Sequence, residues 1–160
     1  MANELRNLEI ASEAKCNPHK FFEMIKYTLH HLPTYFPEAF KSTDVLEGDG
    51  ESVGSIRLWK YILPGRSDIR VAKEKINVVD DENMWLILEV FEGNLANEYG
   101  TFVLMIHVIP TEDGCSVKWS VEYGKGAEGV SDPHHYLDFF VMINQKLVAT
   151  LLAKEQTAQV

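Results

Sequence analysis

The chain has 160 residues, of which 46% are hydrophobic and 24% charged, a composition typical of one globular domain and wrong for a disordered chain. A total of 15 basic and 24 acidic side chains give a formal net charge of -9, and such a surface repels polyanions. We therefore expect a single domain over residues 1–160, with neither nucleic acid nor an anionic membrane surface as its partner.

The first predicted elements are one strand and two short helical pieces. Residues 5–14 alternate between apolar and polar side chains, which predicts a strand. Asn17 is a good helix cap and Pro18 fits the first helical position, so a short helix is expected to begin here. Pro33 and Pro37 interrupt the next stretch, which predicts a broken helix or a turn that carries aromatic side chains.

Strand patterns separated by turn residues fill the middle of the chain. The predicted strands cover residues 41–47, 55–63, 69–79, 84–91, 101–110 and 115–123. Short connections between successive strands favour antiparallel pairing, as in a meander. With the strand at residues 5–14, the pattern predicts a seven-stranded antiparallel sheet.

One long helix is predicted to follow Asp132-Pro133, which repeats the arrangement of a cap and a proline. Spacings of three and four residues place one set of side chains on the same face. This set is Tyr136, Phe140, Ile143, Leu147 and Leu151. The whole apolar arc is too broad for a flat surface, so a curved sheet is expected to grip the helix. The expected fold class is therefore α+β, with the sheet curled around a long C-terminal helix.

Residues 47–54 are rich in glycine, which invites comparison with phosphate-binding loops. The spacing is G-x-G-x-x-x-G, no lysine follows Gly54, and the next segment is a strand instead of the helix N-terminus that cradles phosphate. Asp49 and Glu51 would also repel a phosphate. The stretch is therefore predicted to be a hairpin turn, and no nucleotide is expected to bind.

The positions of the histidines do not predict a metal site. His30-His31 and His134-His135 are neighbours in sequence, and adjacent side chains diverge on a helix. No His-Glu-x-x-His or Cys-x-x-Cys spacing occurs, and the Gly-x-Ser-x-Gly motif of serine hydrolases is missing. We therefore expect neither a metal nor any other cofactor.

The chain is expected to be cytoplasmic. Its beginning lacks the basic region and apolar run of a signal peptide, and no apolar stretch is expected to be long enough for a membrane span. Cys16 and Cys115 are expected to be free thiols in a reducing compartment. A monomer or a weak dimer is expected.

Alternation in the strands places rows of apolar and aromatic side chains on the concave face of the sheet. Because tryptophan and tyrosine carry polar tips, such rows suit a pocket for a mostly apolar ligand, but they suit a packed core equally well. For the pocket, a volume of roughly a few hundred Å³ is expected. Its predicted ligand-binding lining is Trp59, Leu86, Leu88, Phe102, Leu104, Ile106, Trp119, Phe140 and Ile143.

Four stretches occur together, in order and with similar spacing, in a known group of plant proteins. They are the glycine-rich turn at residues 46–59, Phe91-Glu92-Gly93, residues 117–123, and Asp132-Pro133-His134 before the last helix. The set resembles the major latex protein group of the birch-pollen-allergen, or pathogenesis-related class 10, superfamily. The resemblance covers nearly the whole chain. It implies that two short helices close one end of the curled sheet and that a large cavity binds a lipophilic small molecule.

The resemblance also implies that an enzyme is an alternative. In this superfamily, norcoclaurine synthase condenses an amine with an aldehyde, and related proteins isomerise morphinan alkaloids or direct the cyclisation of an iridoid enol to nepetalactol. Norcoclaurine synthase uses a lysine in a context similar to Cys115-Ser116-Val117-Lys118. Alternation, in contrast, places Lys118 opposite the apolar row that contains Trp119.

Two functions therefore stay open at this point. One is carriage of a hydrophobic plant metabolite, and the other is a cofactor-free cyclase or isomerase that needs only a shaped cavity and groups that move a proton. The candidate proton-transfer residues are Tyr61, Tyr99, Tyr123 and Tyr136, with Lys118 added by the resemblance.

Overall fold

The computed structural model describes residues 4–126 and 128–158 of the chain. The elements in chain order are β1 (Arg6–Ala14), α1 (Pro18–Thr28), a 3-10 turn (Leu29–His31), α2 (Leu32–Tyr35), β2 (Phe40–Glu47), β3 (Ile56–Tyr61), β4 (Arg70–Asp80), β5 (Trp85–Gly93), α3 (Asn94–Tyr99), β6 (Phe102–Thr111), β7 (Gly114–Tyr123) and α4 (His134–Ala158). Each predicted strand and the long last helix therefore form at the expected places, with shifts of a few residues at their ends.

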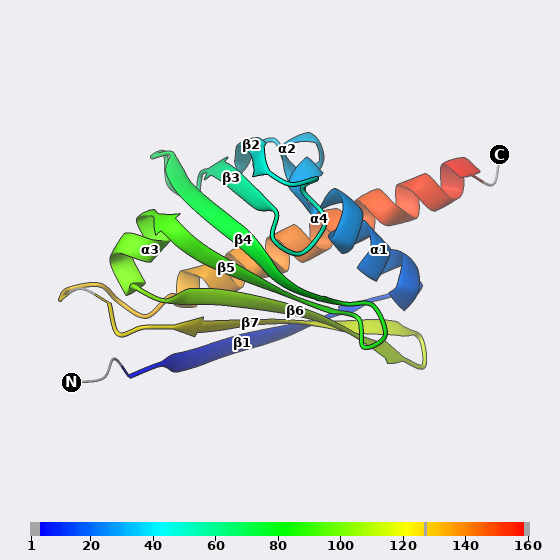
Figure 1. The fold of residues 1–160 in the computed structure, drawn as a ribbon. Coiled ribbons are helices and arrows are strands. Elements are labelled where there is room, and N and C mark those ends of the chain that lie inside the picture. Colours follow the sequence, from blue (N-terminus) through cyan, green and yellow to red (C-terminus); the bar gives the residue numbers. More distant parts are fainter. Residues whose placement is uncertain (1–3, 127, 159–160) are drawn as a thin grey trace.

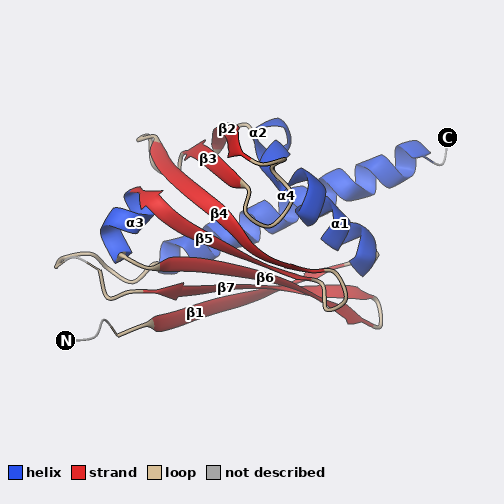
Figure 2. Cartoon of the chain, in the orientation of Figure 1, coloured by secondary structure: helices blue, strands red, loops and turns tan. Residues whose placement is uncertain are grey.

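The sheet is fully antiparallel, with the strand order β1-β7-β6-β5-β4-β3-β2. It curls along α4, with α1 and α2 beside the later part of this helix and α3 at the opposite end (Figures 1 and 2). The ladder between β4 and β5 shifts register after Lys73 and again after Ile76. Such bulges bend a strand and increase its twist, which helps the sheet to curve. The predicted α+β fold is confirmed.

The α1 helix begins as its sequence predicts, and α4 begins one residue later than expected, because Pro133 precedes its first helical residue. The Asn17 side-chain oxygen accepts a hydrogen bond from the Lys20 backbone N–H at 3.1 Å, and Pro18 is the first residue of α1. The α4 helix begins directly after Asp132-Pro133. Its predicted apolar face is buried, from Tyr136 to Leu151. The sequence therefore predicts both the start of α4 and the side that faces the sheet.

The length and composition of α4 bear on the expected absence of a membrane span. Within the part of the chain that the structure describes, residues 134–156 form one helix that is long and apolar enough to cross a membrane. The buried side chains of this helix pack against the sheet and the other helices, as in the core helix of a globular protein. Hydropathy over a helix cannot by itself distinguish these two situations.

The short helix α3 is absent from the prediction, which expected only turn residues between the strands at 84–91 and 101–110. Its six residues are too few to show helical periodicity. Gly93 precedes it with a φ of +106°, and a Cβ atom there would lie 2.1 Å from the backbone oxygen of Val71. Only glycine fits this close approach, so β5 can turn into α3 without a longer loop.

The glycine-rich stretch connects β2 to β3 as a hairpin, which confirms the prediction. The Asp49 carboxylate accepts hydrogen bonds from the backbone N–H groups of Glu51 and Ser52 and from the hydroxyls of Ser52 and Ser55. These hydrogen bonds lower the pKa of Asp49 below its usual value. The loop donors that would hold a phosphate are thus bound to a carboxylate of the chain itself.

Cys16 and Cys115 are free thiols, and both are buried. Burial raises the pKa of Cys16 to about 12 and also raises that of Cys115. Because the thiolate is the reactive form, both side chains behave as small apolar groups of the core.

Candidate functional site

A cavity of about 90 Å³ lies between the concave face of the sheet and α4. Nine of the residues predicted for the pocket or for proton transfer line it: Trp59, Tyr61, Leu88, Phe102, Leu104, Trp119, Tyr136, Phe140 and Ile143. The lining also includes residues outside the predicted set: Leu29, Leu32, Phe40, Ala72, Glu74, Val90, Leu95 and Phe139. The interior thus holds both a packed core and a real space.

The cavity is smaller than the few hundred Å³ expected. Phe40 and Phe139 stack with ring centroids 5.3 Å apart, and Tyr61 stacks on Phe139 at 5.9 Å. Trp119 stacks on Phe140 at 5.1 Å. These aromatic pairs join the sheet to α4 and fill much of the space, because stacked rings reach across the interior from both sides.

A gap in the aromatic wall explains where the space lies. On β3 and β4, Trp59 is the cross-strand partner of Ala72, and Ala72 is the partner of Gly93 on β5. Ala72 and Gly93 thus place two small residues side by side in the sheet. The aromatic rings nearby do not move into this gap, because they would lose the stacking contacts that they make with one another.

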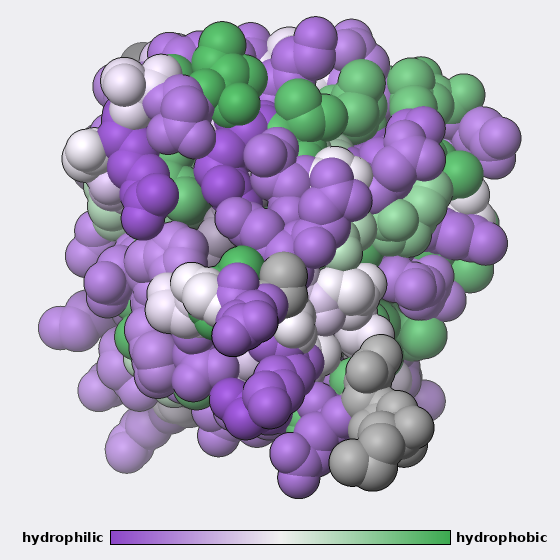
Figure 3. Space-filling view, turned by 90° about the vertical axis from the view of Figure 1, so that its left-hand side faces the viewer, coloured by the Kyte–Doolittle hydropathy of each residue, from purple (hydrophilic) through white to green (hydrophobic). Residues whose placement is uncertain are grey.

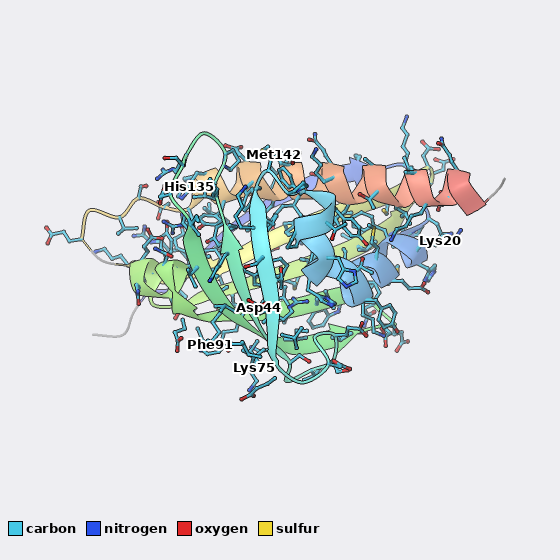
Figure 4. The ribbon with its side chains drawn as sticks, turned by 90° about the horizontal axis from the view of Figure 1, so that it is seen from above. Lys20, Asp44, Lys75, Phe91, His135 and Met142 are labelled. Atoms are coloured by element: carbon cyan, nitrogen blue, oxygen red, sulfur yellow. The ribbon has the colours of Figure 1, made fainter. Side chains whose placement is uncertain are left out.

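A buried ion pair forms one polar cluster at the cavity. Arg57 and Glu74 are cross-strand partners on β3 and β4, with 1% and 6% of their surfaces exposed. Glu74 Oε1 accepts hydrogen bonds from Arg57 Nε at 2.6 Å and from Trp59 Nε1 at 2.7 Å. Arg57 Nη1 donates to the Gly50 backbone oxygen at 3.3 Å, which connects the pair to the glycine-rich loop. Lys75, the next residue on β4, points outward (Figure 4).

A second polar cluster joins Tyr61 and Tyr136, two of the predicted proton-transfer residues. Their hydroxyl oxygens are 2.6 Å apart, and Arg70 Nε donates a hydrogen bond to the Tyr136 hydroxyl at 3.1 Å. Arg70 also pairs with Glu98 of α3. Burial raises the pKa values of both tyrosines. At neutral pH the two hydroxyls are therefore protonated, and they can donate a hydrogen bond but cannot serve as bases.

The other predicted residues lie away from this cavity. Tyr99 and Tyr123 pack edge to face with each other, and the Tyr99 hydroxyl donates to the Ser131 backbone oxygen. Lys118 lies on the outer face of β7, where its amine is 3.6 Å from Glu9. Between the two alternatives that the sequence left open for Lys118, the structure shows the outward orientation, because β7 alternates without a bulge.

Leu86 and Ile106, also predicted to contact a ligand, are buried on β5 and β6 but do not reach the cavity. They are cross-strand partners one position beyond Leu88 and Leu104 on the same face. They contribute to the core beside the cavity, so alternation predicts the correct face but not which residues border the space.

Glu74 and Ala72 were missed, although a signal for them exists. Both belong to the alternate residues of β4 that point inward, together with Arg70 and Ile76. An acidic residue on the buried face of a strand requires a partner. Arg57 lies on the same buried face of the sheet, on the preceding strand β3. This combination would have indicated a buried ion pair.

His30 predicts a dependence of stability on pH. Burial, with His31 and Arg57 nearby, lowers its pKa from 6.5 to about 4. Between these values the unfolded chain binds a proton that the folded chain does not, so the free energy of unfolding should fall as the pH drops from about 6.5 to 4. Since the side chain is partly exposed, we expect a loss of about 1–2 kcal/mol.

Chemical denaturation of the wild type and of His30→Gln at several pH values measures this effect. The variant should show a smaller slope between pH 6.5 and 4 than the wild type, because the contribution of His30 is gone. His19→Gln is the matched control, because His19 is exposed on α1, and it should keep the slope. An unchanged slope in His30→Gln would contradict the assignment.

No group of three histidine, cysteine, aspartate or glutamate side chains among residues 4–126 and 128–158 is placed to hold a metal ion. The surface at the end that carries α3 shows mainly hydrophilic side chains (Figure 3). The features that could serve a ligand are thus the apolar cavity and its two polar clusters.

Comparison of the sequence with known proteins gives a consistent result. Residues 5–154 match the model of the pathogenesis-related protein Bet v 1 family. The chain is 37% identical over 150 residues to MLP-like protein 43 of Arabidopsis thaliana, an alignment that covers 92% of this chain and 94% of that protein.

Comparison of the structure agrees. Major latex-like protein 151 of Panax ginseng matches with a TM-score of 0.85 and 31% identity, over 92% of this chain and 98% of that one. Norcoclaurine synthase of Thalictrum flavum, solved in complex with dopamine and hydroxybenzaldehyde, matches with a TM-score of 0.80 over 94% of this chain and 88% of that one. At 24% identity, the second match shows a shared fold.

Proposed function

Because the chain belongs to the pathogenesis-related protein Bet v 1 family, with major latex-like proteins among its relatives, we propose that it binds a hydrophobic plant metabolite in the cavity beneath α4. The observation that carries the proposal is the cavity itself, whose wall is almost entirely apolar and aromatic. A few polar groups in an apolar wall are typical of sites for small molecules. The apolar wall binds the ligand by burying its surface, and the polar groups fix its orientation. In this proposal residues 1–160 act as one ligand-binding domain.

Binding can be tested by heteronuclear NMR with benzyl alcohol, a small and mostly apolar probe. The indole N–H signals of Trp59 and Trp119, which line the cavity, should shift in a saturable manner. The signal of Trp85, which does not line it, should stay in place and serves as the internal control. Native mass spectrometry of protein from its source tissue should detect a retained small molecule. Failure of the Trp59 and Trp119 signals to respond to any apolar probe would refute the proposal.

A second function, a cofactor-free isomerase or cyclase, is favoured by the Tyr61–Tyr136 pair. Whichever hydroxyl donates within the pair, the accepting tyrosine keeps its own proton free for a bound molecule. Such a protonated hydroxyl can donate to a carbonyl or enol oxygen and stabilise the negative charge that develops there. Iridoid or other terpenoid enols and alkaloids are the proposed substrate classes.

The enzyme hypothesis predicts a loss of rate without a loss of binding. With a reactive iridoid enol or an alkaloid isomerisation substrate, Tyr61→Phe and Tyr136→Phe should lower the rate of selective product formation by about 10²–10⁴. Tyr99→Phe and Lys118→Met are controls outside the cavity and should retain the wild-type rate. Equal product ratios with and without the wild-type protein, for ligands that it binds, would leave carriage as the function.

A further inference from the structure

Among the described residues that line the largely apolar cavity, one carries a carboxylate. Glu74 lines this space and is more than nine-tenths buried. A carboxylate in such a position is stable only with strong partners, because its transfer from water costs several kcal/mol. Arg57 supplies the compensating charge from the neighbouring strand. Arg57 itself does not line the cavity, so a molecule inside would meet the acidic member of the pair.

The hydrogen bonds to this carboxylate are distributed unequally. Oε1 receives the donors from Arg57 and Trp59, and the Arg57 Nη2 ion-pair contact is also to Oε1. Oε2 has no hydrogen-bond partner among the described residues, and it is not among the polar atoms that protein completely covers. A buried carboxylate oxygen with open lone pairs is an acceptor that lacks a donor, and such groups are rare in folded proteins.

We propose that Glu74 Oε2 accepts a hydrogen bond from a hydroxyl group of the bound molecule, and that the ligands of this cavity are therefore apolar alcohols or phenols. The inference rests on the proposed ligand-binding function and names the chemical class within it. Glu74 then selects for one functional group, while the apolar wall binds the rest of the molecule.

Charge decides between a hydroxyl and the other polar groups that a metabolite can carry. Arg57 and Glu74 together are neutral, so a hydroxyl donor leaves the interior without net charge. An ammonium group would add a buried positive charge without its own partner, and a carboxylate would meet Glu74 as a like charge. A methyl or ethyl group would leave Oε2 without a donor. The hydroxyl is the group that satisfies the acceptor at the lowest desolvation cost.

The position of Glu74 also suggests how such a ligand lies. Ala72 is the next inward residue on β4, and Arg70, which donates to Tyr136, follows it. Inward residues on a strand are about 6.6 Å apart, so the two polar clusters are separated by roughly 13 Å along β4. A molecule anchored at Glu74 would extend its apolar body over Ala72 toward the tyrosine pair.

Three molecules of nearly equal shape test this inference on the wild-type protein: benzyl alcohol, ethylbenzene and benzylamine. Their affinities are measured from the Trp59 and Trp119 indole signals. A hydrogen bond to a charged acceptor predicts that benzyl alcohol binds about 10- to 100-fold more tightly than ethylbenzene. Benzylamine, which is cationic at pH 7, should bind more weakly than benzyl alcohol.

A double variant assigns the preference to Glu74. Arg57→Met/Glu74→Leu removes both charges together, so that no single charge stays buried, and it should bind benzyl alcohol no better than ethylbenzene. Lys73→Met/Glu92→Gln alters an ion pair of the outer face and should keep the wild-type preference. If circular dichroism shows that the double variant does not fold, the wild-type comparison decides alone.

The outcomes separate the two proposals. If ethylbenzene or benzylamine binds the wild type as tightly as benzyl alcohol, the hydroxyl preference is refuted while ligand binding stands. If the folded double variant retains the preference, Glu74 is not its origin and the inference fails. If none of the three molecules shifts the Trp59 and Trp119 signals, the ligand-binding function and the inference fail together.

Discussion

Replacement of Ala72 by phenylalanine should abolish ligand binding while the protein stays folded. The new ring would enter the gap beside Gly93 and occupy the cavity of about 90 Å³. One extra methylene in a tight pocket changes affinity by about 10–200-fold, so an added ring should reduce benzyl alcohol binding by at least that factor. Overpacking should lower the free energy of unfolding by about 1–3 kcal/mol.

The control for this variant is Val71→Phe, which adds a ring to the same strand on the opposite face. Its affinity for benzyl alcohol should equal that of the wild type. Both measurements use the Trp59 and Trp119 indole signals, together with a denaturation curve that confirms a cooperative fold. Wild-type affinity in a folded Ala72→Phe protein would show that ligands bind outside this cavity.

The second large effect concerns the buried ion pair. Arg57→Met should lower the free energy of unfolding by about 3–5 kcal/mol, because the carboxylate of Glu74 then stays buried without its counter-charge. In the double variant Arg57→Met/Glu74→Leu both charges are absent, and the loss should shrink to about 1–3 kcal/mol, because apolar side chains replace such a pair at little cost but the buried Trp59 N–H loses its acceptor.

Urea denaturation with circular dichroism detection measures these differences. Glu92→Gln provides the comparison with an exposed ion pair, because Glu92 is 3.0 Å from Lys73 and its side chain is 64% exposed. This variant should change stability by less than about 1 kcal/mol. The single variant Glu74→Leu completes the comparison. If the loss of stability in the double variant equals the sum of the losses in Arg57→Met and Glu74→Leu, the two charges do not stabilise each other.

The sequence by itself determined the elements and their faces. Alternation in β7 predicts that Trp119 points inward and Lys118 outward, and the structure places both side chains in this way. The cap at Asn17 and the proline after Asp132 predict where α1 and α4 begin. These features depend on neighbours within a few residues, so a local pattern contains the necessary information.

The tertiary structure decided which of the inward residues meet and how much space they leave. Tyr61 and Tyr136 are 75 positions apart, and only the curl of the sheet around α4 brings their hydroxyls within 2.6 Å. The pairing of Arg57 with Glu74 and of Ala72 with Gly93 depends on the register of β3, β4 and β5, including the shift after Lys73. Periodicity gives the direction of a side chain but not its cross-strand neighbour.

The cavity volume is the property that the sequence pattern predicts least well. The stacking of Phe40 on Phe139 across the interior reduces the space, while the small side chain of Ala72 keeps part of it open. Both effects depend on packing distances of a few tenths of an ångström between elements far apart in the chain, and dispersion contacts are decided at that scale. The same row of aromatic side chains is therefore compatible with a filled core or a hollow one until the curvature of the sheet is fixed.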